Sequence, residues 1–271
     1  MPLRIQSFEF CERADVPRWI RESIVEILGM GLSTSHVFQP VAPVFYALCK
    51  LVGADEVLDL GSGSGEPVVL LIEELRRQGL AAPRFTLSDL LPNLPQLRKT
   101  ASRYPGQLKV IAESVDATAI PDQFNQPLQT IINAFHHFPP PLAGKILAET
   151  IQKQRAIFII ESSTRRLYNS WGLIPGLFRS YWQNPVRAEQ DRFLKAFFSY
   201  VIPLIGICFI WDSLVSLARF YNEAELRKMA SDAGGSHYTW VYQELAYPSL
   251  GRAVVFYGYP SLHDDTVSSR E

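Results

Sequence analysis

The stretch VLDLGSGSGEP, residues 57–67, decides the fold of this chain. It joins a short apolar run to a turn that contains three glycines, Gly61, Gly63 and Gly65. A buried strand, a glycine-rich turn and a helix in this order are typical of α/β proteins that bind a nucleotide. The residues around the turn narrow the kind of nucleotide that fits.

Apolar strands and helices alternate on both sides of this turn. Strands are predicted at 56–60, 84–88, 108–112, 129–134 and 156–161, with helices at 67–78, 92–103 and 141–154 between them. This alternation predicts an α/β fold with a parallel sheet and helices on both of its faces. Apolar residues at three- and four-residue steps predict further helices within 16–50.

The alternation breaks after residue 161. Residues 162–222 are mostly apolar and aromatic without a clear strand, so we expect a helical insertion there. Asn222 and Glu225 have the spacing of a capping box, which predicts the start of a helix. Strands at 237–247 and 252–259 are close enough in sequence to form a hairpin. The predicted units are an N-terminal helical cap segment (1–50), a nucleotide-binding core (51–161), a lid insertion (162–222) and a last helix with antiparallel strands that complete the core (223–271).

The turn is poorly suited to phosphate groups. A dinucleotide-binding turn has a third glycine where this chain has Glu66, and a negative charge there would repel a pyrophosphate. Pro67 removes one backbone amide, and no Gly-Lys-Ser/Thr follows as in a P-loop. The turn therefore favours a nucleoside ligand without phosphate. S-adenosylmethionine is such a ligand, and it carries a sulfonium.

Three aspartates lie at or just after the ends of the first three strands. Asp89 is placed to accept both ribose hydroxyls, although it could instead cap the next helix. Asp116 lies one strand further out, where an adenine amino group would be, although it could instead close a loop. Asp59 lies beneath the turn, where it could accept loop amides or meet the methionyl ammonium.

Together, VLDLGSGSGEP (57–67), TLSDLLPN (86–93), SVDAT (114–118) and INAFHHF (132–138) resemble the class I S-adenosylmethionine-dependent methyltransferases. The resemblance covers about residues 54–259, and WDSLVSLARFYNEAEL (211–226) is similar to a bacterial subgroup whose substrates are mostly unassigned. It implies a Rossmann-like sheet of seven mostly parallel strands with an antiparallel last strand. It also implies binding of S-adenosylmethionine, with S-adenosylhomocysteine as the product. Glu66 departs from the family, in which related turns often carry a smaller residue.

The resemblance also assigns residues to the cofactor site. Asp59 and the three glycines match the glycine-rich motif, Asp89 matches the ribose acid, and Asn133 matches the start of the motif after the fourth strand. The predicted cofactor-binding set is Asp59, Gly61, Gly63, Gly65, Asp89, Leu90, Asp116, Ala117 and Asn133.

Residues that follow the fourth and fifth strands are the candidates for catalysis. His136 and His137 could act as a general base for an oxygen acceptor, or could be packing histidines. In an extended chain they would point to opposite sides, so we expect at most one of them, with His136 favoured, to face the acceptor. Glu161 could orient the acceptor or cap the next helix. No metal site is expected, because no third ligand has suitable spacing along the sequence.

The insertion is the predicted cover of the acceptor pocket. Its aromatic side chains suggest an apolar lining, or else they pack the core of the insertion itself. These residues are Tyr168, Trp171, Phe178, Tyr181, Trp182, Phe193, Phe197, Phe198 and Trp211. A small, largely apolar acceptor is therefore expected. The uncharged run Ala196–Trp211 is too short and too interrupted for a spanning helix, but contact with a membrane surface is an open alternative.

Charge and cysteine content limit the partners. The net charge of −1 provides no basic surface for nucleic acid, so none is expected as a partner. Three scattered cysteines and the absence of a signal-like N-terminus favour a cytoplasmic protein with reduced thiols. The predicted function is methyl transfer from S-adenosylmethionine to a small molecule. Alternatives are cyclisation or elimination on the same fold, a non-enzymatic binding module, and a membrane-associated methyltransferase with a lipid-like acceptor.

Overall fold

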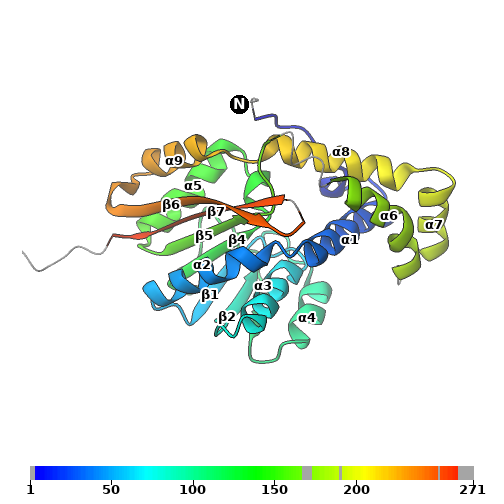
Figure 1. Cartoon of the computed structure of the whole chain (residues 1–271). Coiled ribbons are helices and arrows are strands. Elements are labelled where there is room, and N and C mark those ends of the chain that lie inside the picture. Colours follow the sequence, from blue (N-terminus) through cyan, green and yellow to red (C-terminus); the bar gives the residue numbers. More distant parts are fainter. Residues whose placement is uncertain (1–3, 167–172, 189–190, 250, 262–271) are drawn as a thin grey trace, which may run out of the picture.

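A computed structural model describes residues 4–166, 173–188, 191–249 and 251–261 (Figure 1). Within them, seven strands form one sheet in the order β3-β2-β1-β4-β5-β7-β6. The strands are β1 (Glu56–Leu60), β2 (Arg84–Ser88), β3 (Leu108–Val110), β4 (Leu128–Ile132), β5 (Ala156–Glu161), β6 (Tyr238–Tyr247) and β7 (Gly251–Pro260). The first five strands run parallel, and β7 is antiparallel to both β5 and β6. The predicted mostly parallel sheet with an antiparallel last strand is confirmed.

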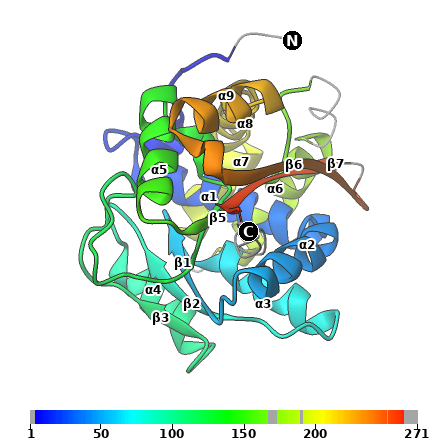
Figure 2. The same ribbon diagram turned by 90° about the vertical axis from the view of Figure 1, so that its left-hand side faces the viewer.

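Helices cover both faces of this sheet (Figure 2). The helices are α1 (Arg18–Ser35), α2 (Phe38–Leu51), α3 (Glu66–Arg77), α4 (Leu94–Ser102), α5 (Pro140–Gln152), α6 (Leu173–Arg187), α7 (Arg192–Tyr200), α8 (Leu204–Arg219) and α9 (Glu223–Asp232), with short 3-10 turns η1 (Phe10–Glu12), η2 (Phe135–His137) and η4 (Gly235–His237). Side chains of α2, α3 and α4 pack on one face, and those of α5 and α9 pack on the other. The predicted capping box is present at α9, where Asn222 accepts from the amide of Glu225 and Glu225 accepts from the amide of Asn222.

The N-terminal helices belong to two different parts of the molecule. Phe45 of α2 packs between Phe85 and Phe158 of the sheet, with ring centroids 5.9 and 5.3 Å away. By contrast, α1 packs against α8 through Ile20, Ile24 and Ile27. Helices α1, α6, α7 and α8 thus form a lobe at one end of the sheet (Figure 1).

Several aromatic side chains of the predicted lid face outward rather than lining a pocket or packing a core. Phe178, Trp182, Phe193, Phe197 and Trp211 are all exposed, and Phe193 is 92% exposed. Phe198 does pack inside the lobe, stacked on Trp19, and Tyr181 is half-buried. Tyr168 and Trp171 lie outside the described residues.

The outward direction of these side chains follows from what the inner face of α7 carries. Lys195 is 1% exposed and forms an ion pair with Glu26 of α1 at 2.8 Å. Ser199, one turn later, is also buried. Because these polar residues occupy the inner face of α7, its phenylalanines Phe193 and Phe197 lie on the outer face.

In the part of the chain that the structure describes, no single helix is both long and apolar enough to cross a membrane. Helices α7 and α8 meet the length and hydropathy criteria only as a pair, and the pair is bent by 78°.

Candidate active site at the carboxyl ends of the parallel strands

The glycine turn connects β1 to α3 through three residues in left-handed backbone conformations. The φ angles of Gly61, Gly63 and Gly65 are +68°, +55° and +75°, which glycine adopts without steric cost. At Gly65 a side chain is also excluded by space, because a Cβ there would lie 2.9 Å from Cδ1 of Leu87. The turn therefore brings the backbone close to β2 and directs the first amides of α3 toward the sheet edge.

Asp59 stabilises the glycine turn through hydrogen bonds. Its carboxylate is 2% exposed and accepts hydrogen bonds from the hydroxyls of Ser62 at 2.6 Å and Thr130 at 2.7 Å. These partners differ from the loop amides and the methionyl ammonium that the sequence suggested. Burial raises the pKa of Asp59 to about 7. Asp59 thus links the turn after β1 to β4.

Asp89 reaches back from the end of β2 to the glycine turn. One oxygen accepts from the amide of Gly63 at 2.9 Å, and the other accepts from the amide of Leu91 at 2.9 Å. Each carboxylate oxygen has a second lone pair, so both can still accept a ligand hydroxyl. The alternative that Asp89 caps the following helix is wrong, because α4 begins later and Asn93 caps it.

Asp116 lies beside Asp89 at the same edge. The amide of Val115 donates to the carbonyl of Asp89 at 2.9 Å, which brings the two segments together. Asp116 itself is exposed and accepts from the amide and hydroxyl of Thr118, so it also closes a local turn. Its neighbour Ala117 is buried, and Leu90 on the Asp89 side is exposed.

Asn133 ends β4 and ties it to β5. Its φ angle is +52°, a conformation that asparagine tolerates better than most residues. Its side-chain oxygen accepts from the amide of Ser162 at 2.6 Å, and its own amide donates to Ile160 at 2.7 Å. This kink ends the strand earlier than predicted. It also places Ala134 beside the turn, since a Cβ on Gly61 would lie 3.7 Å from that of Ala134.

Glu66, which stands where related turns often carry a smaller residue, has a structural role. Glu66 is the first residue of α3 and forms an ion pair with Arg103, which follows α4. Its negative charge is also favourable at the amino end of a helix, where the helix dipole is positive. Glu66 therefore joins two helices beside the turn.

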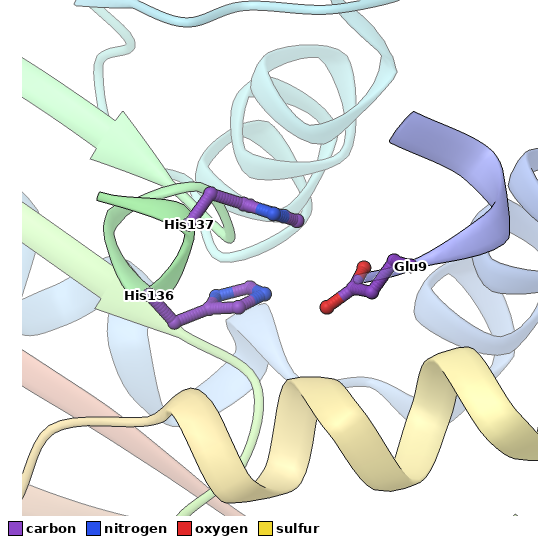
Figure 3. Close-up of side chains that lie close together, drawn as sticks. All are labelled: Glu9, His136 and His137. Atoms are coloured by element: carbon purple, nitrogen blue, oxygen red, sulfur yellow. The ribbon is translucent and has the colours of Figure 1, made fainter. Parts of the chain in front are cut away.

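His136 and His137 lie side by side rather than on opposite sides of an extended chain. Residues Phe135–His137 form the 3-10 turn η2, so the alternation expected of a strand does not apply. The two ring centroids are 4.1 Å apart, and both rings extend toward the N-terminal segment (Figure 3). The prediction that only one ring would face the site assumed an extended backbone. That assumption was wrong, because the two histidines lie in a 3-10 turn.

Glu161 positions His136. Its Oε1 accepts from the backbone amide of His136 at 2.8 Å, and its Oε2 lies 2.8 Å from the Nδ1 atom of the ring. Both side chains are buried, and desolvation raises the pKa of Glu161 to about 8 and lowers that of His136 to about 3. Burial favours the uncharged forms of both side chains, and the contact between Oε2 and Nδ1 orients the ring. In this structure Glu161 neither caps a helix nor lies open to an acceptor.

The sequence analysis missed three residues that cover the histidines. Arg219 of α8 is 3% exposed and donates to Glu9 at 3.0 Å and to Glu12 at 2.8 and 2.9 Å. Glu12 also contacts Nδ1 of His137 at 2.5 Å. Burial raises the pKa of Glu12, but its hydrogen bonds with His137 and Arg219 outweigh burial and lower that pKa to about 2. The only sequence signal was that Arg219 lies inside the 211–226 motif.

A groove of about 560 Å³ lies elsewhere, between α5 and α9. Arg4, Tyr221 and Lys228 are among its lining residues, and none of the predicted cofactor residues lines it. The glycine turn and the aspartates, rather than this groove, carry the directed polar groups that a nucleoside ligand needs.

The sequence matches no protein-family model and no curated protein. Solved structures do match. A candidate O-methyltransferase from Nostoc punctiforme is 18% identical with a TM-score of 0.50, over 95% of this chain and 64% of that one, so this chain spans less than two thirds of its length. The magnesium protoporphyrin IX methyltransferase of Synechocystis with bound S-adenosylhomocysteine is 13% identical over 93% and 91% of the two chains, with a TM-score of 0.48. The 1,6-didemethyltoxoflavin-N1-methyltransferase of Burkholderia thailandensis is 15% identical over 84% and 80%, with a TM-score of 0.46.

The sheet order with its antiparallel β7 and the glycine turn after β1 agree with this similarity. The chain has the fold of the class I S-adenosylmethionine-dependent methyltransferases.

Proposed function

We propose that the protein transfers the methyl group of S-adenosylmethionine to a small-molecule acceptor. The observation that carries this proposal is the contact between Asp89 and the amide of Gly63, which sets a carboxylate at the mouth of the glycine turn. A diol-binding acid beside a turn that disfavours phosphate fits a nucleoside with a sulfonium better than a dinucleotide.

In this proposal the chain's own residues bind and orient the cofactor. Asp89 accepts the ribose hydroxyls, and Asp116 with Ala117 lies next to it for the adenine. The turn at Gly61 and Gly63 faces the methionyl part, held in place by Asp59. When bound, S-adenosylmethionine supplies a methyl group that an acceptor atom takes as the carbon–sulfur bond breaks, leaving S-adenosylhomocysteine and one proton released from the acceptor.

The acceptor is proposed to be small because a net charge of −1 gives no excess of basic residues for binding a nucleic acid. In this proposal the segment around Glu9 and Glu12, which packs over His136 and His137 and against α8, covers the bound acceptor. Enclosure of this kind excludes water and aligns the reacting atoms.

Product analysis tests methyl transfer against other chemistry on the same fold. The protein is incubated with S-adenosylmethionine and a panel of small hydroxyl, amine and thiol acceptors, and nucleoside products are separated chromatographically. Methyl transfer predicts S-adenosylhomocysteine in a one-to-one ratio with methylated acceptor. Release of methylthioadenosine would instead indicate cyclisation or elimination, and methylation of RNA or protein alone would contradict a small acceptor.

A second candidate places the acceptor in a lipid bilayer. Ile174, Phe178, Trp182 and Val186 follow one another at four-residue steps on α6 and are 50–71% exposed. The Trp182 ring lies 6.3 Å from that of Tyr200, which connects this stripe to the exposed face of α7. An outward apolar face with aromatic residues is typical of helices that lie at a membrane surface.

Flotation with liposomes tests this second candidate. We expect the wild-type protein to float with phosphatidylglycerol vesicles and a Phe193→Ser/Phe197→Ser variant to stay in the dense fraction. Leu51→Ser, on the exposed side of α2, is the matched control and should float like the wild type. A wild-type protein that stays in the dense fraction would exclude the membrane alternative.

A further inference from the structure

The side chains of Glu9, His136 and His137 converge from two segments that are far apart in sequence. One metal-ligating atom from each residue lies within 4.8 Å of the other two. Figure 3 shows the carboxylate of Glu9 pointing toward the rings of both histidines. The sequence argument against a metal site considered spacing along the chain, and Glu9 comes close to the histidines only through the fold.

We propose that Glu9, His136 and His137 bind a divalent transition-metal ion. Two imidazole nitrogens and one carboxylate oxygen suit Zn²⁺, Co²⁺, Ni²⁺ or Fe²⁺, whereas Mg²⁺ and Ca²⁺ prefer oxygen ligands alone. Three protein ligands leave coordination positions open for water or for an oxygen-bearing small molecule.

The surroundings of both histidines match those of metal ligands. Nδ1 of His136 lies 2.8 Å from Glu161, and Nδ1 of His137 lies 2.5 Å from Glu12. Histidine ligands commonly use one ring nitrogen for the metal and donate the other N–H to a carboxylate. Here the carboxylates engage Nδ1 in both rings, so the Nε2 atoms remain for an ion.

Glu9 is buried, and one of its two carboxylate oxygens has only a weak hydrogen-bond partner. It is 2% exposed, and its Oε1 accepts from Ser216 at 2.8 Å and from Arg219 at 3.0 Å. Among the described residues, Oε2 has only the thiol of Cys11, at 3.7 Å. A buried carboxylate oxygen with so weak a partner is costly unless a stronger one is bound.

Arg219 lies at the edge of the proposed site. Its Nη1 atom donates to Oε1 of Glu9 at 3.0 Å and to Glu12 at 2.8 Å, and it lies 3.2 Å from Nδ1 of His137. It therefore orients two carboxylates, and an arginine in this role leaves Oε2 of Glu9 accessible to an ion.

A neighbouring trio, Glu9 with Cys11 and Asp212, is also close enough to share an ion. It is less suitable, because the two oxygens of Asp212 already accept the amides of Phe10 and Cys11 at 2.7 and 2.9 Å. Binding there would break both hydrogen bonds of a buried carboxylate. A Cys11→Ser variant separates the two sites experimentally.

The test uses untagged protein stripped of metal with a chelator. We expect Zn²⁺ to bind in a one-to-one ratio by calorimetry, and Co²⁺ to give visible absorption bands of a protein-bound ion. His137→Gln and Glu9→Gln should weaken binding by more than the roughly 10–100-fold expected for loss of an outer partner. Cys11→Ser and His237→Gln, which changes an exposed histidine elsewhere, should bind as the wild type does.

Thermal melting of each variant with and without Zn²⁺ controls for misfolding. A folded His137→Gln protein should lose the stabilisation by Zn²⁺ that the wild type shows. Absence of stoichiometric binding to the wild type would overturn the proposal. Binding that survives both His137→Gln and Glu9→Gln, or that Cys11→Ser abolishes, would overturn it too. None of these measurements depends on methyl transfer.

Discussion

The Oδ2 atom of Asp89 accepts a hydrogen bond from the backbone amide of Gly63 at 2.9 Å. This contact holds the end of β2 against the turn that follows β1. The carboxylate of Asp89 therefore connects the two segments that form the candidate cofactor site. The turn must keep its backbone conformation for this contact to form, and the glycines of the turn are the residues that allow it.

Replacement of Gly65 by alanine tests the turn. A Cβ at Gly65 meets both a positive φ angle and Leu87 at 2.9 Å, whereas one at Gly53 meets a positive φ angle and open space. We expect Gly53→Ala to lower the free energy of unfolding by about 1–2 kcal/mol. Gly65→Ala should lower the free energy of unfolding by about 1–3 kcal/mol more than Gly53→Ala does, because its new methyl group is overpacked against Leu87. Urea denaturation measures both, and equal losses would show that space at Gly65 is not limiting.

Asp59 should make stability depend on pH. Burial raises its pKa to about 7 in the folded protein, so between pH 4 and 7 the folded state holds a proton that the unfolded state releases. The contribution of this group therefore lowers the free energy of unfolding as pH rises through that range, by up to about 4 kcal/mol. Asp59→Asn should remove this component when unfolding is measured at pH 5 and 7. An unchanged pH dependence in the variant would contradict it.

Arg219 should be essential for the cover over the histidines. Its removal leaves Glu9 as a buried carboxylate without its cation, which typically costs about 3–5 kcal/mol. We expect Arg219→Met to lose stability of this size in chemical denaturation. Adding Glu9→Gln to Arg219→Met should recover part of the loss, because no buried charge then remains unpaired. A loss within 1 kcal/mol for Arg219→Met would mean that water already solvates Glu9.

The sheet was predictable from sequence because its signals are local. Each parallel strand is a short apolar run that lies next to a helix or turn signal in the sequence. The glycine turn and the aspartates lie at the ends of such strands, so the strand order of the fold brings them to one edge of the sheet. Even there, the end of β4 was misplaced by two residues, since Asn133 adopts a left-handed conformation and accepts a hydrogen bond from the amide of Ser162, which directly follows β5.

The cover and the lobe were not predictable in the same way. Glu9 and Glu12 contact Arg219 and His137 across more than 120 positions of sequence, and no local pattern indicates such contacts. For the segment of α7 the sequence indicated only an apolar, aromatic helical insertion, which does not say which face of the helix is buried. The ion pair of Lys195 with Glu26 on α1 decides that, and it turns the phenylalanines outward.

Calorimetric titration with S-adenosylmethionine and S-adenosylhomocysteine tests the central claim most directly. The account predicts that the wild-type protein binds both nucleosides. Asp89→Ala should weaken the binding of both by at least about tenfold through loss of the ribose contacts. Asp15→Ala, which changes an exposed aspartate paired with Arg13, should bind like the wild type. Thermal melting confirms that each variant is folded. Equal binding by Asp89→Ala and the wild type, or no binding of either nucleoside by the wild type, would contradict the proposed cofactor site.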